Sequence, residues 1–215
     1  DYEHRLAAML SARASATSIE ENDPGRIASL LAVLFPGAHT DAPDWQKVAA
    51  FLAFRNRLTV LLGGPGTGKT RTVSRALALL LALEGSDLRV SVTAPTGKAA
   101  ARLKSAIRNA KRELAESVPA MAGLEDEVRT IHRLLRIHPE TGVPRFDARN
   151  PLDADVLVVD EASMVDLALM TKLVAALPET SRLILIGDRD QLAAVEAGSV
   201  LGDLAPIGGG NRFSH

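Results

Sequence analysis

The chain has 215 residues, of which 47% are hydrophobic, so it can bury the core of one large domain or two small ones. Its formal net charge of -1 excludes a global basic field, and any nucleic-acid partner must bind a local patch. With one Trp, one Tyr and five Phe, the chain is poor in side chains that stack on bases, so a nucleic acid would be held by its backbone. The absence of cysteine excludes disulfides and thiolate metal sites.

Two stretches of the sequence bear on whether the protein enters a membrane. The first residues, DYEHRLAAML, are charged and contain no signal-peptide core. The leucine-rich run from Leu77 to Leu83 is too short to span a bilayer. We therefore expect a cytoplasmic protein that has no contact with a membrane.

Residues 1–41 differ from the rest of the chain. Two short amphipathic segments, Tyr2 to Arg13 and Ile27 to Phe35, flank a polar stretch, and the sequence PGAHTDAP then forms a break. These segments contain too little apolar material for a core of their own. We expect residues 1–41 to be the end of an N-terminal helical domain that packs against something else, and residues 42–215 to form a separate domain.

In the remainder of the chain, apolar strands alternate with amphipathic helices. The spacing predicts helices over 44–56, 69–84 and 96–118, and strands over 58–62, 88–94, 155–161 and 182–188. A last helix is expected over 163–177, with Ser163 and Asp166 as its capping pair. Residues 119–155 are expected to be irregular apart from a helical patch from Thr130 to Ile137. This α/β order predicts a mostly parallel sheet with helices on both faces and with ligands at the carboxyl ends of the strands.

The stretch LTVLLGGPGTGKT, residues 58–70, ends an apolar strand with a glycine-rich turn that fits the phosphate-binding pattern G-x-x-x-x-G-K-[ST]. Glycines let the backbone approach a triphosphate closely, and the helix that follows adds N–H groups and the positive end of its dipole. In this pattern Lys69 reaches the β- and γ-phosphate oxygens, and Thr70 can ligate Mg²⁺. The alternative is a glycine-rich strand-to-helix turn without a ligand. We call residues Gly63 to Thr70 the phosphate-binding loop.

Two carboxylates, Asp160 and Glu161, follow the apolar run VLVV. An Asp at the end of a buried strand beside a phosphate-binding loop suits Mg²⁺, and an adjacent Glu can orient and deprotonate an attacking water. Alternatively, both carboxylates only precede a helix N-terminus, where negative charge is stabilising. After the next strand, Gln191 can bond a γ-phosphate oxygen or the water, although it can equally be a helix cap.

A candidate for contact with the base of a nucleotide lies upstream of the phosphate-binding loop. Gln46 can make a paired contact with N6 and N7 of adenine. Its neighbour Trp45 is expected in the core rather than against a base.

A candidate site for DNA opens the long helix predicted over 96–118. Pro95, Thr96 and Lys98 lie at its start, where backbone N–H groups, a hydroxyl and an ammonium group suit a phosphodiester. The wider basic face of this helix can also be merely solvated. His132, in the sequence RTIHRLL, can touch DNA or be a structural histidine.

Six motifs occur in one order: WQ at 45–46, GGPGTGKT at 63–70, TAPTGKAAARL at 93–103, TIHRLL at 130–135, VLVVDEASMVD at 156–166 and LIGDRDQLAAVEAGSVLGDL at 185–204. In order and spacing they resemble the first motor domain of superfamily 1 DNA helicases. Within that superfamily, the segment QLAAVEAG resembles the RecD family, the alpha subunits of exodeoxyribonuclease V. The resemblance covers about residues 42–205, and residues 1–41 resemble the end of the N-terminal domain, which in that family docks on the RecC-like gamma chain.

The resemblance implies a P-loop NTPase domain of RecA-like fold that uses ATP and Mg²⁺. It also implies a motor that moves 5′ to 3′ on single-stranded DNA, in a complex with RecB-like and RecC-like subunits that unwinds and degrades broken duplex ends for recombinational repair. The nuclease activity in that family belongs to the beta chain.

The resemblance further implies a role for individual residues. Lys69, Glu161 and Gln191 would be catalytic, Thr70 and Asp160 would bind Mg²⁺, and Pro95, Thr96 and His132 would fall in DNA-contacting motifs. The nucleotide would be bound by Gln46, Gly63, Gly64, Pro65, Gly66, Thr67, Gly68, Lys69, Thr70 and Arg71.

The sequence ends at His215, before the second motor domain of that family. The later helicase motifs carry arginines that stabilise the transferring phosphate, a contribution of about 10³ to 10⁵ in rate for arginine fingers. We therefore expect residues 1–215 alone to bind Mg-ATP weakly and to hydrolyse it poorly. Two alternatives stay open: a nucleotide-binding assembly module of a larger complex without turnover of its own, and a P-loop kinase, which the carboxylate pair and the glutamine disfavour.

Overall fold

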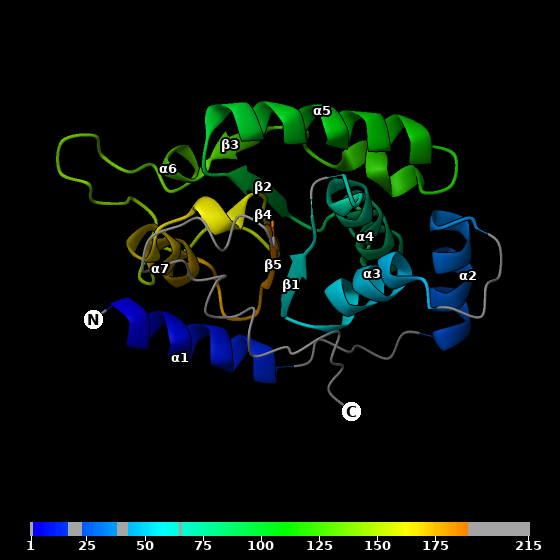
Figure 1. The fold of residues 1–215 in the computed structure, drawn as a ribbon, viewed down its shortest axis with the longest axis horizontal. Coiled ribbons are helices and arrows are strands. Elements are labelled where there is room, and N and C mark those ends of the chain that lie inside the picture. Colours follow the sequence, from blue (N-terminus) through cyan, green and yellow to red (C-terminus); the bar gives the residue numbers. More distant parts are fainter. Residues whose placement is uncertain (1, 17–22, 38–42, 65, 189–215) are drawn as a thin grey trace.

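A parallel sheet of five strands lies at the centre of the computed structural model, which describes residues 2–16, 23–37, 43–64 and 66–188 (Figure 1). Every strand pair is parallel, in the spatial order β1-β5-β4-β2-β3. The strands are β1 (Leu58–Leu62), β2 (Val90–Ala94), β3 (Val128–Thr130), β4 (Val156–Val159) and β5 (Arg182–Gly187). The predicted α/β class with a parallel sheet is confirmed.

Helices cover both faces of this sheet. On one face lie α3 (Trp45–Arg55), α4 (Lys69–Glu84) and α5 (Gly97–Leu114), and on the other lies α7 (Leu167–Ala176) (Figure 1). Alternate side chains of β4 therefore enter different cores: Val156 and Val158 pack in one hydrophobic cluster, whereas Leu157 and Val159 pack in the other. Burial on both faces explains why the sequence of β4 is continuously apolar rather than alternating.

The helix that follows the phosphate-binding loop is the most buried helix of the first cluster. All residues of α4 from Thr72 to Leu81 are buried, because α4 packs against α3, α5 and a short N-terminal helix. The apolar face predicted for α5 is likewise confirmed, since Leu103, Ile107 and Leu114 are buried. The start of α4 and the start of α5 are thus held firmly on one side of the sheet.

The two amphipathic segments of the N-terminal region are helices, α1 (Tyr2–Ser15) and α2 (Pro24–Leu34). Helix α1 packs against α7 and buries Leu6 and Leu10, whereas α2 packs against α4. The guanidinium of Arg13 is buried and donates to the carbonyl oxygens of Leu177 at 2.6 Å and Ser181 at 2.8 Å. Both helices therefore lie on the flanks of the sheet domain. None of the helices in the described part of the chain has the length and hydropathy of a membrane span.

The stretch expected to be irregular contains more regular structure than the sequence pattern indicates. It includes the 3-10 helix η1 (Pro119–Gly123) and the strand β3, which were not predicted. The predicted helical patch from Thr130 to Ile137 is present as the one-turn helix α6 (Ile131–Leu134). Strand β3 has three residues, too few to give a periodic signal, and it exists because it pairs with β2. The loop 136–150 beyond α6 projects from one end of the molecule (Figure 1).

The predicted capping pair of the last helix is wrong. Ser163 lies in the 3-10 helix η2 (Ala162–Met164), and α7 begins only at Leu167. Asp166 is itself the N-cap, because its carboxylate accepts a hydrogen bond from the backbone N–H of Leu169 at 2.8 Å.

A buried ion pair ties three elements together at the amino edge of the sheet. The guanidinium of Arg182, at the start of β5, donates to both carboxylate oxygens of Glu84 at 2.9 and 2.6 Å. It also donates to the carbonyl oxygen of Phe54 at 3.0 Å and lies over the Phe54 ring. The side chains of Arg182 and Glu84 are 8% and 20% exposed, so this pair links the ends of α3 and α4 to β5 with little screening by water.

We expect Glu84→Gln to lower the free energy of unfolding by about 2 to 3 kcal/mol, because a neutral amide leaves the buried guanidinium without a counter-charge. Urea denaturation measures this loss. The control is Glu127→Gln, which removes an exposed partner of Arg129 and should leave the midpoint unchanged. Equal losses in the two variants would contradict the assignment of Arg182 and Glu84 as a structural clamp.

Candidate functional site

The carboxyl ends of three strands, β1, β4 and β5, meet at one edge of the sheet, where predicted nucleotide residues lie. The register aligns Leu62 of β1 with Gly187 of β5, and Val159 of β4 with Leu185 of β5. A cleft of about 720 Å³ opens at this edge. It is lined by the phosphate-binding loop, by Asp160 and Glu161, and by one face of α5. The predicted convergence of these motifs is confirmed for the described residues.

The described part of the phosphate-binding loop is a tight turn whose backbone favours glycine at two positions. Gly66 and Gly68 have φ angles of 75° and 81°, in the left-handed region. The hydroxyl of Thr67 donates to the carbonyl oxygen of Gly64 at 2.9 Å and closes the turn. A Cβ at Gly63 would lie 2.8 Å from that hydroxyl oxygen, so a side chain there would open the loop.

Lys69 lies at the start of α4 and folds over the loop. Its ammonium group donates to the carbonyl oxygens of Gly63 and, at 2.8 Å, of Gly64. The N-cap of α4 is Gly68, and within the described residues no side chain caps this helix end. The first N–H groups of α4 therefore face the cleft as donors for an anion, as expected of a phosphate site.

Gln46 is brought to the back of the phosphate-binding loop. Helix α3 begins after the N-cap Asp44, whose carboxylate accepts from the backbone N–H of Gln46 at 3.0 Å. The side-chain amide of Gln46 then donates to the carbonyl oxygen of Thr67 at 3.3 Å. The expectation that Trp45 is a core residue is wrong, because it is 48% exposed. As the first residue of α3, Trp45 projects from the helix end instead of from its buried face.

The two carboxylates after β4 differ in their surroundings. Asp160 is largely buried, and its carboxylate accepts from the backbone N–H of Glu161 at 2.9 Å. Burial raises the pKa of Asp160, and the Glu161 N–H and the charges of Arg102 and Lys69 oppose the rise only in part. Glu161 has a φ angle of 50°, and its carboxylate lies 3.4 Å from a guanidinium nitrogen of Arg102. The left-handed backbone at Glu161 is a strained conformation for a residue with a side chain.

Ser163 is a cleft residue for which the sequence pattern predicted only a role in a helix cap. It is 2% exposed, and its hydroxyl has no hydrogen-bond partner among the described residues. Because buried hydroxyls normally have a partner, this one is a candidate to bind a water or a ligand atom. The sequence signal that could have identified Ser163 as a cleft residue is its position two residues after Glu161.

The donor set fits a nucleoside triphosphate with a divalent cation. The cleft offers the uncapped start of α4, the ammonium of Lys69 and the hydroxyl of Thr70 on one side, and the carboxylate of Asp160 on the other. The glycines let the loop pack tightly on itself, since a Cβ at Gly68 would lie 2.9 Å from the Gln46 amide nitrogen and one at Gly63 would lie 2.8 Å from the Thr67 hydroxyl oxygen. Hard oxygen ligands of this kind suit Mg²⁺. Arg71 also lines the cleft, although it reaches Glu113 of α5 at 3.3 Å.

The residues proposed to contact DNA lie at two neighbouring strand ends. Ala94 of β2 is in register with Thr130 of β3, so Pro95 and Thr96 emerge beside the start of α6. Thr96 is the N-cap of α5, and its hydroxyl accepts from the backbone N–H of Ala99 at 3.2 Å. Lys98 and His132 are exposed at this edge. The exposure of His132 leaves it accessible to DNA, and its predicted contact with DNA stays a prediction.

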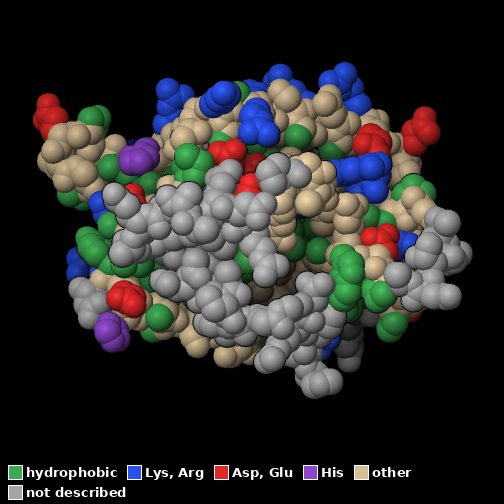
Figure 2. All heavy atoms as spheres, in the orientation of Figure 1, with side chains coloured by type: hydrophobic (Ala, Val, Ile, Leu, Met, Phe, Trp, Pro, Cys, Tyr) green, Lys and Arg blue, Asp and Glu red, His purple; other side chains and the backbone are tan. Residues whose placement is uncertain are grey.

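Basic side chains gather along α5 (Figure 2). The far half of this face is engaged locally: Arg108 pairs with Asp126, and Lys111 donates to the carbonyl oxygen of Leu124 at 2.5 Å. The near half, with Lys98 and Arg102, adjoins the strand ends and the cleft. The helix thus has two basic parts with different surroundings.

Two candidates of the nucleotide site, Pro65 and Gln191, lie outside the described residues. Their predicted roles stay predictions.

We expect Gly68→Ala to lower the free energy of unfolding by about 1 to 2 kcal/mol, since the new Cβ meets the Gln46 amide in a left-handed backbone conformation. The double variant Gly68→Ala with Gln46→Ala should recover only the steric part of this loss. The control is Gly97→Ala, where nothing lies within 4 Å of the new Cβ, and it should cause no loss. Urea denaturation of the three variants measures the difference, and a full recovery in the double variant would contradict the strain at Gly68.

We expect Asp160→Asn to raise the free energy of unfolding at neutral pH by about 0.5 to 1 kcal/mol while weakening Mg²⁺-dependent nucleotide binding. Burial raises the pKa of Asp160 above its ordinary value of 3.8, so the folded state binds more protons than the unfolded state just above that pH. Asp160 therefore contributes less stability as the pH rises through this window. The advantage of the Asn variant should grow from pH 4 upward and then level off, and urea denaturation at several pH values tests this. An advantage that is constant with pH would contradict burial of the Asp160 charge as its cause.

Comparisons with known proteins agree with this arrangement. The RecBCD enzyme subunit RecD of Haemophilus influenzae is 47% identical over 166 residues, which cover 75% of this chain and 26% of that protein. The subunit RecD of Mycobacterium tuberculosis (strain H37Rv) is 49% identical over 167 residues, which cover 75% of this chain and 28% of that protein. The ATP-dependent RecD2 DNA helicase of Deinococcus radiodurans is 43% identical over 150 residues, which cover 70% of this chain and 18% of that protein.

The chain thus spans about a quarter of the length of the RecD proteins it matches, and the resemblance to RecD seen in the motifs is confirmed. The family described as AAA domain matches residues 46–197, which include the phosphate-binding loop and the two carboxylates. Because this match covers most of the sequence, the chain belongs to the AAA domain family.

Proposed function

We propose that this chain contains the first motor domain of an ATP-dependent DNA helicase that moves 5′ to 3′ on single-stranded DNA. The observation that carries the proposal is the single cleft in which the phosphate-binding loop faces Asp160 and Glu161, next to an exposed edge suited to phosphodiesters. The relatives support it, since they are RecBCD subunits and a DNA helicase. Sequence identity of 43% to 49% over most of this chain makes a shared activity the simplest inference.

We assign the nucleotide contacts to residues on both sides of the cleft. Lys69 and the start of α4 would hold the phosphates of ATP, and Thr70 with Asp160 would hold Mg²⁺. The cation neutralises charge on the phosphate oxygens. Gln46 would contact the adenine base from behind the loop.

Glu161 is the proposed general base. Its carboxylate would orient a water molecule and take its proton, while Asp160 beside it would hold Mg²⁺. Gln191, outside the described residues, would sense the γ-phosphate. The neighbouring strand ends, with Pro95, Thr96, Lys98 and His132, would hold the DNA backbone.

The names of the relatives also lead to proposals about the whole protein. We propose a cytoplasmic assembly with RecB-like and RecC-like subunits that acts on broken duplex ends. Residues 1–41 would be the end of an N-terminal domain, and residues 42–215 would belong to motor domain 1. Helices α1 and α2 pack on the sheet domain. The proposed boundary at residue 41 would therefore separate parts with different functions that are nevertheless packed together.

The test is the rate of ATP hydrolysis by the full-length protein with and without single-stranded DNA. We expect strong stimulation by DNA, and we expect Glu161→Gln to lower kcat by about 10² or more while nucleotide binding persists, because the base is lost but the phosphate contacts remain. The matched control Glu116→Gln removes an exposed carboxylate from the segment after α5 and should leave both rates unchanged.

Other outcomes would favour other functions. Nucleotide binding without hydrolysis in either condition would point to an assembly module, and hydrolysis or phosphate transfer that ignores DNA would point to a kinase.

A further inference from the structure

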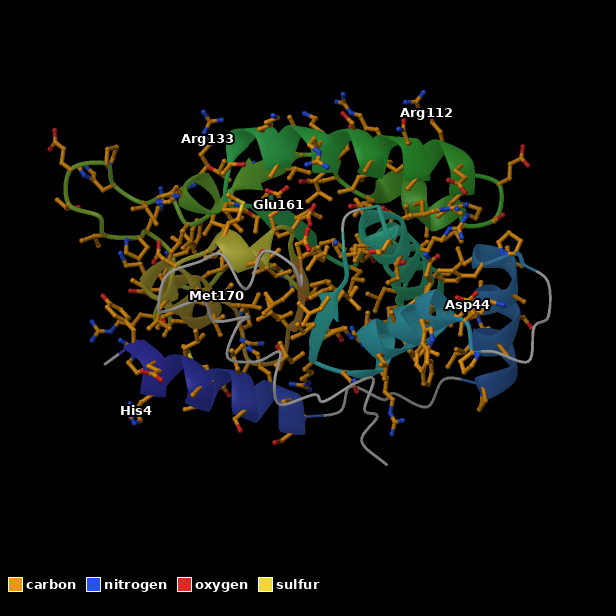
Figure 3. The ribbon with its side chains drawn as sticks, in the orientation of Figure 1. His4, Asp44, Arg112, Arg133, Glu161 and Met170 are labelled. Atoms are coloured by element: carbon orange, nitrogen blue, oxygen red, sulfur yellow. The ribbon has the colours of Figure 1, made fainter. Side chains whose placement is uncertain are left out.

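An ion pair joins α5, the helix that begins at the proposed DNA site, to Glu161, the proposed general base. Arg102 of α5 and Glu161 after β4 are 59 residues apart in sequence, and a guanidinium nitrogen lies 3.4 Å from a carboxylate oxygen. Both residues line the nucleotide cleft. Figure 3 shows Glu161 below α5 in this view, after the carboxyl end of β4. The general base is therefore in contact with the helix that begins at the proposed DNA site.

The surroundings of this pair favour a contact that breaks readily. The side chain of Arg102 is 75% exposed and that of Glu161 is 29% exposed, so water and salt screen the attraction. The structural clamp of Arg182 and Glu84 is different, with two shorter hydrogen bonds and side chains that are 8% and 20% exposed. The pair of Arg102 and Glu161 can therefore break and form new contacts easily, whereas the pair of Arg182 and Glu84 cannot.

The geometry of α5 offers Arg102 a second partner. Lys98 and Arg102 are four residues apart, so they lie on the same face of the helix, about 6 Å apart along its axis. The adjacent residues Ala99 and Leu103 are buried and hold α5 on the rest of the domain, while they also line the cleft beside Arg102. A phosphodiester bound by Lys98 would thus bring the next stretch of DNA backbone within reach of the exposed guanidinium.

We propose that Arg102 is a positioning residue that couples DNA binding to hydrolysis. Without DNA, its guanidinium holds the carboxylate of Glu161 away from the attacking water. With DNA on the start of α5, the guanidinium moves to a phosphate, and Glu161 is free to accept a proton from water. The proposal deepens the proposed function and rests on it.

The experiment compares full-length wild type with Arg102→Gln, Arg102→Lys and the control Arg112→Gln. Arg112 is an exposed arginine near the far end of α5, and it points away from the molecule (Figure 3). For each protein, the ATPase kcat and KM are measured with and without a thymidine oligonucleotide, and DNA binding is measured over a range of salt concentrations.

For Arg102→Gln we expect the rate without DNA to rise by about fivefold while the rate with DNA and the KM for ATP stay unchanged, so that the stimulation by DNA falls. The slope of log affinity against log salt should decrease in magnitude by about 0.7, as for the loss of one phosphate contact on a single strand. Arg102→Lys keeps the charge and should lie between wild type and Arg102→Gln. Arg112→Gln should leave the ratio of the two rates as in wild type.

An unchanged ratio in Arg102→Gln, or a lower rate without DNA, would overturn the coupling while the proposed function stands. A salt slope equal to that of wild type would overturn the transfer to phosphate. If wild type itself shows no stimulation by DNA, the proposed function fails, and the coupling fails with it.

Discussion

Burial of β4 and β5 on both faces is the constraint on which the rest of the structure depends. Two layers of helices pack on these strands, so their side chains alternate between two separate cores and the strands must be apolar throughout. Polar residues can then appear only where the strands end. Because the strands are parallel, those ends meet at one edge, and the phosphate-binding loop is brought opposite Asp160 and Glu161. The site is thus a consequence of how the core is covered.

Local signals explain what could be predicted from the sequence. The phosphate-binding loop, the strand before it and α4 follow one another directly, and glycine spacing with helical periodicity is enough to identify them. The parallel order of the sheet followed from the alternation of strands and helices. Gln46 was predicted only as a contact for adenine, and its hydrogen bond to Thr67, 21 residues later in the chain, could not be predicted from a local pattern.

The features that could not be predicted depend on contacts between distant parts of the chain. Strand β3 has three residues and is ordered by pairing with β2, which no local pattern reveals. Ser163 matched a capping pattern, but the strained turn at Glu161 turns its hydroxyl into the interior. Trp45 looked like a core residue, yet the first position of a helix points it outward. The ion pair of Arg102 and Glu161 joins two motifs whose spacing carries no information about the contact.

The buried guanidinium of Arg13 has a consequence for biosynthesis. Its two carbonyl partners lie 164 and 168 residues later in the chain, next to the end of α7 and the start of β5. On the ribosome, α1 therefore emerges long before the surface that covers Leu6 and Leu10 has been made. The packing of α1 on α7 is therefore among the last contacts of this domain that synthesis makes possible, and folding of the domain around α1 waits for the chain up to Ser181.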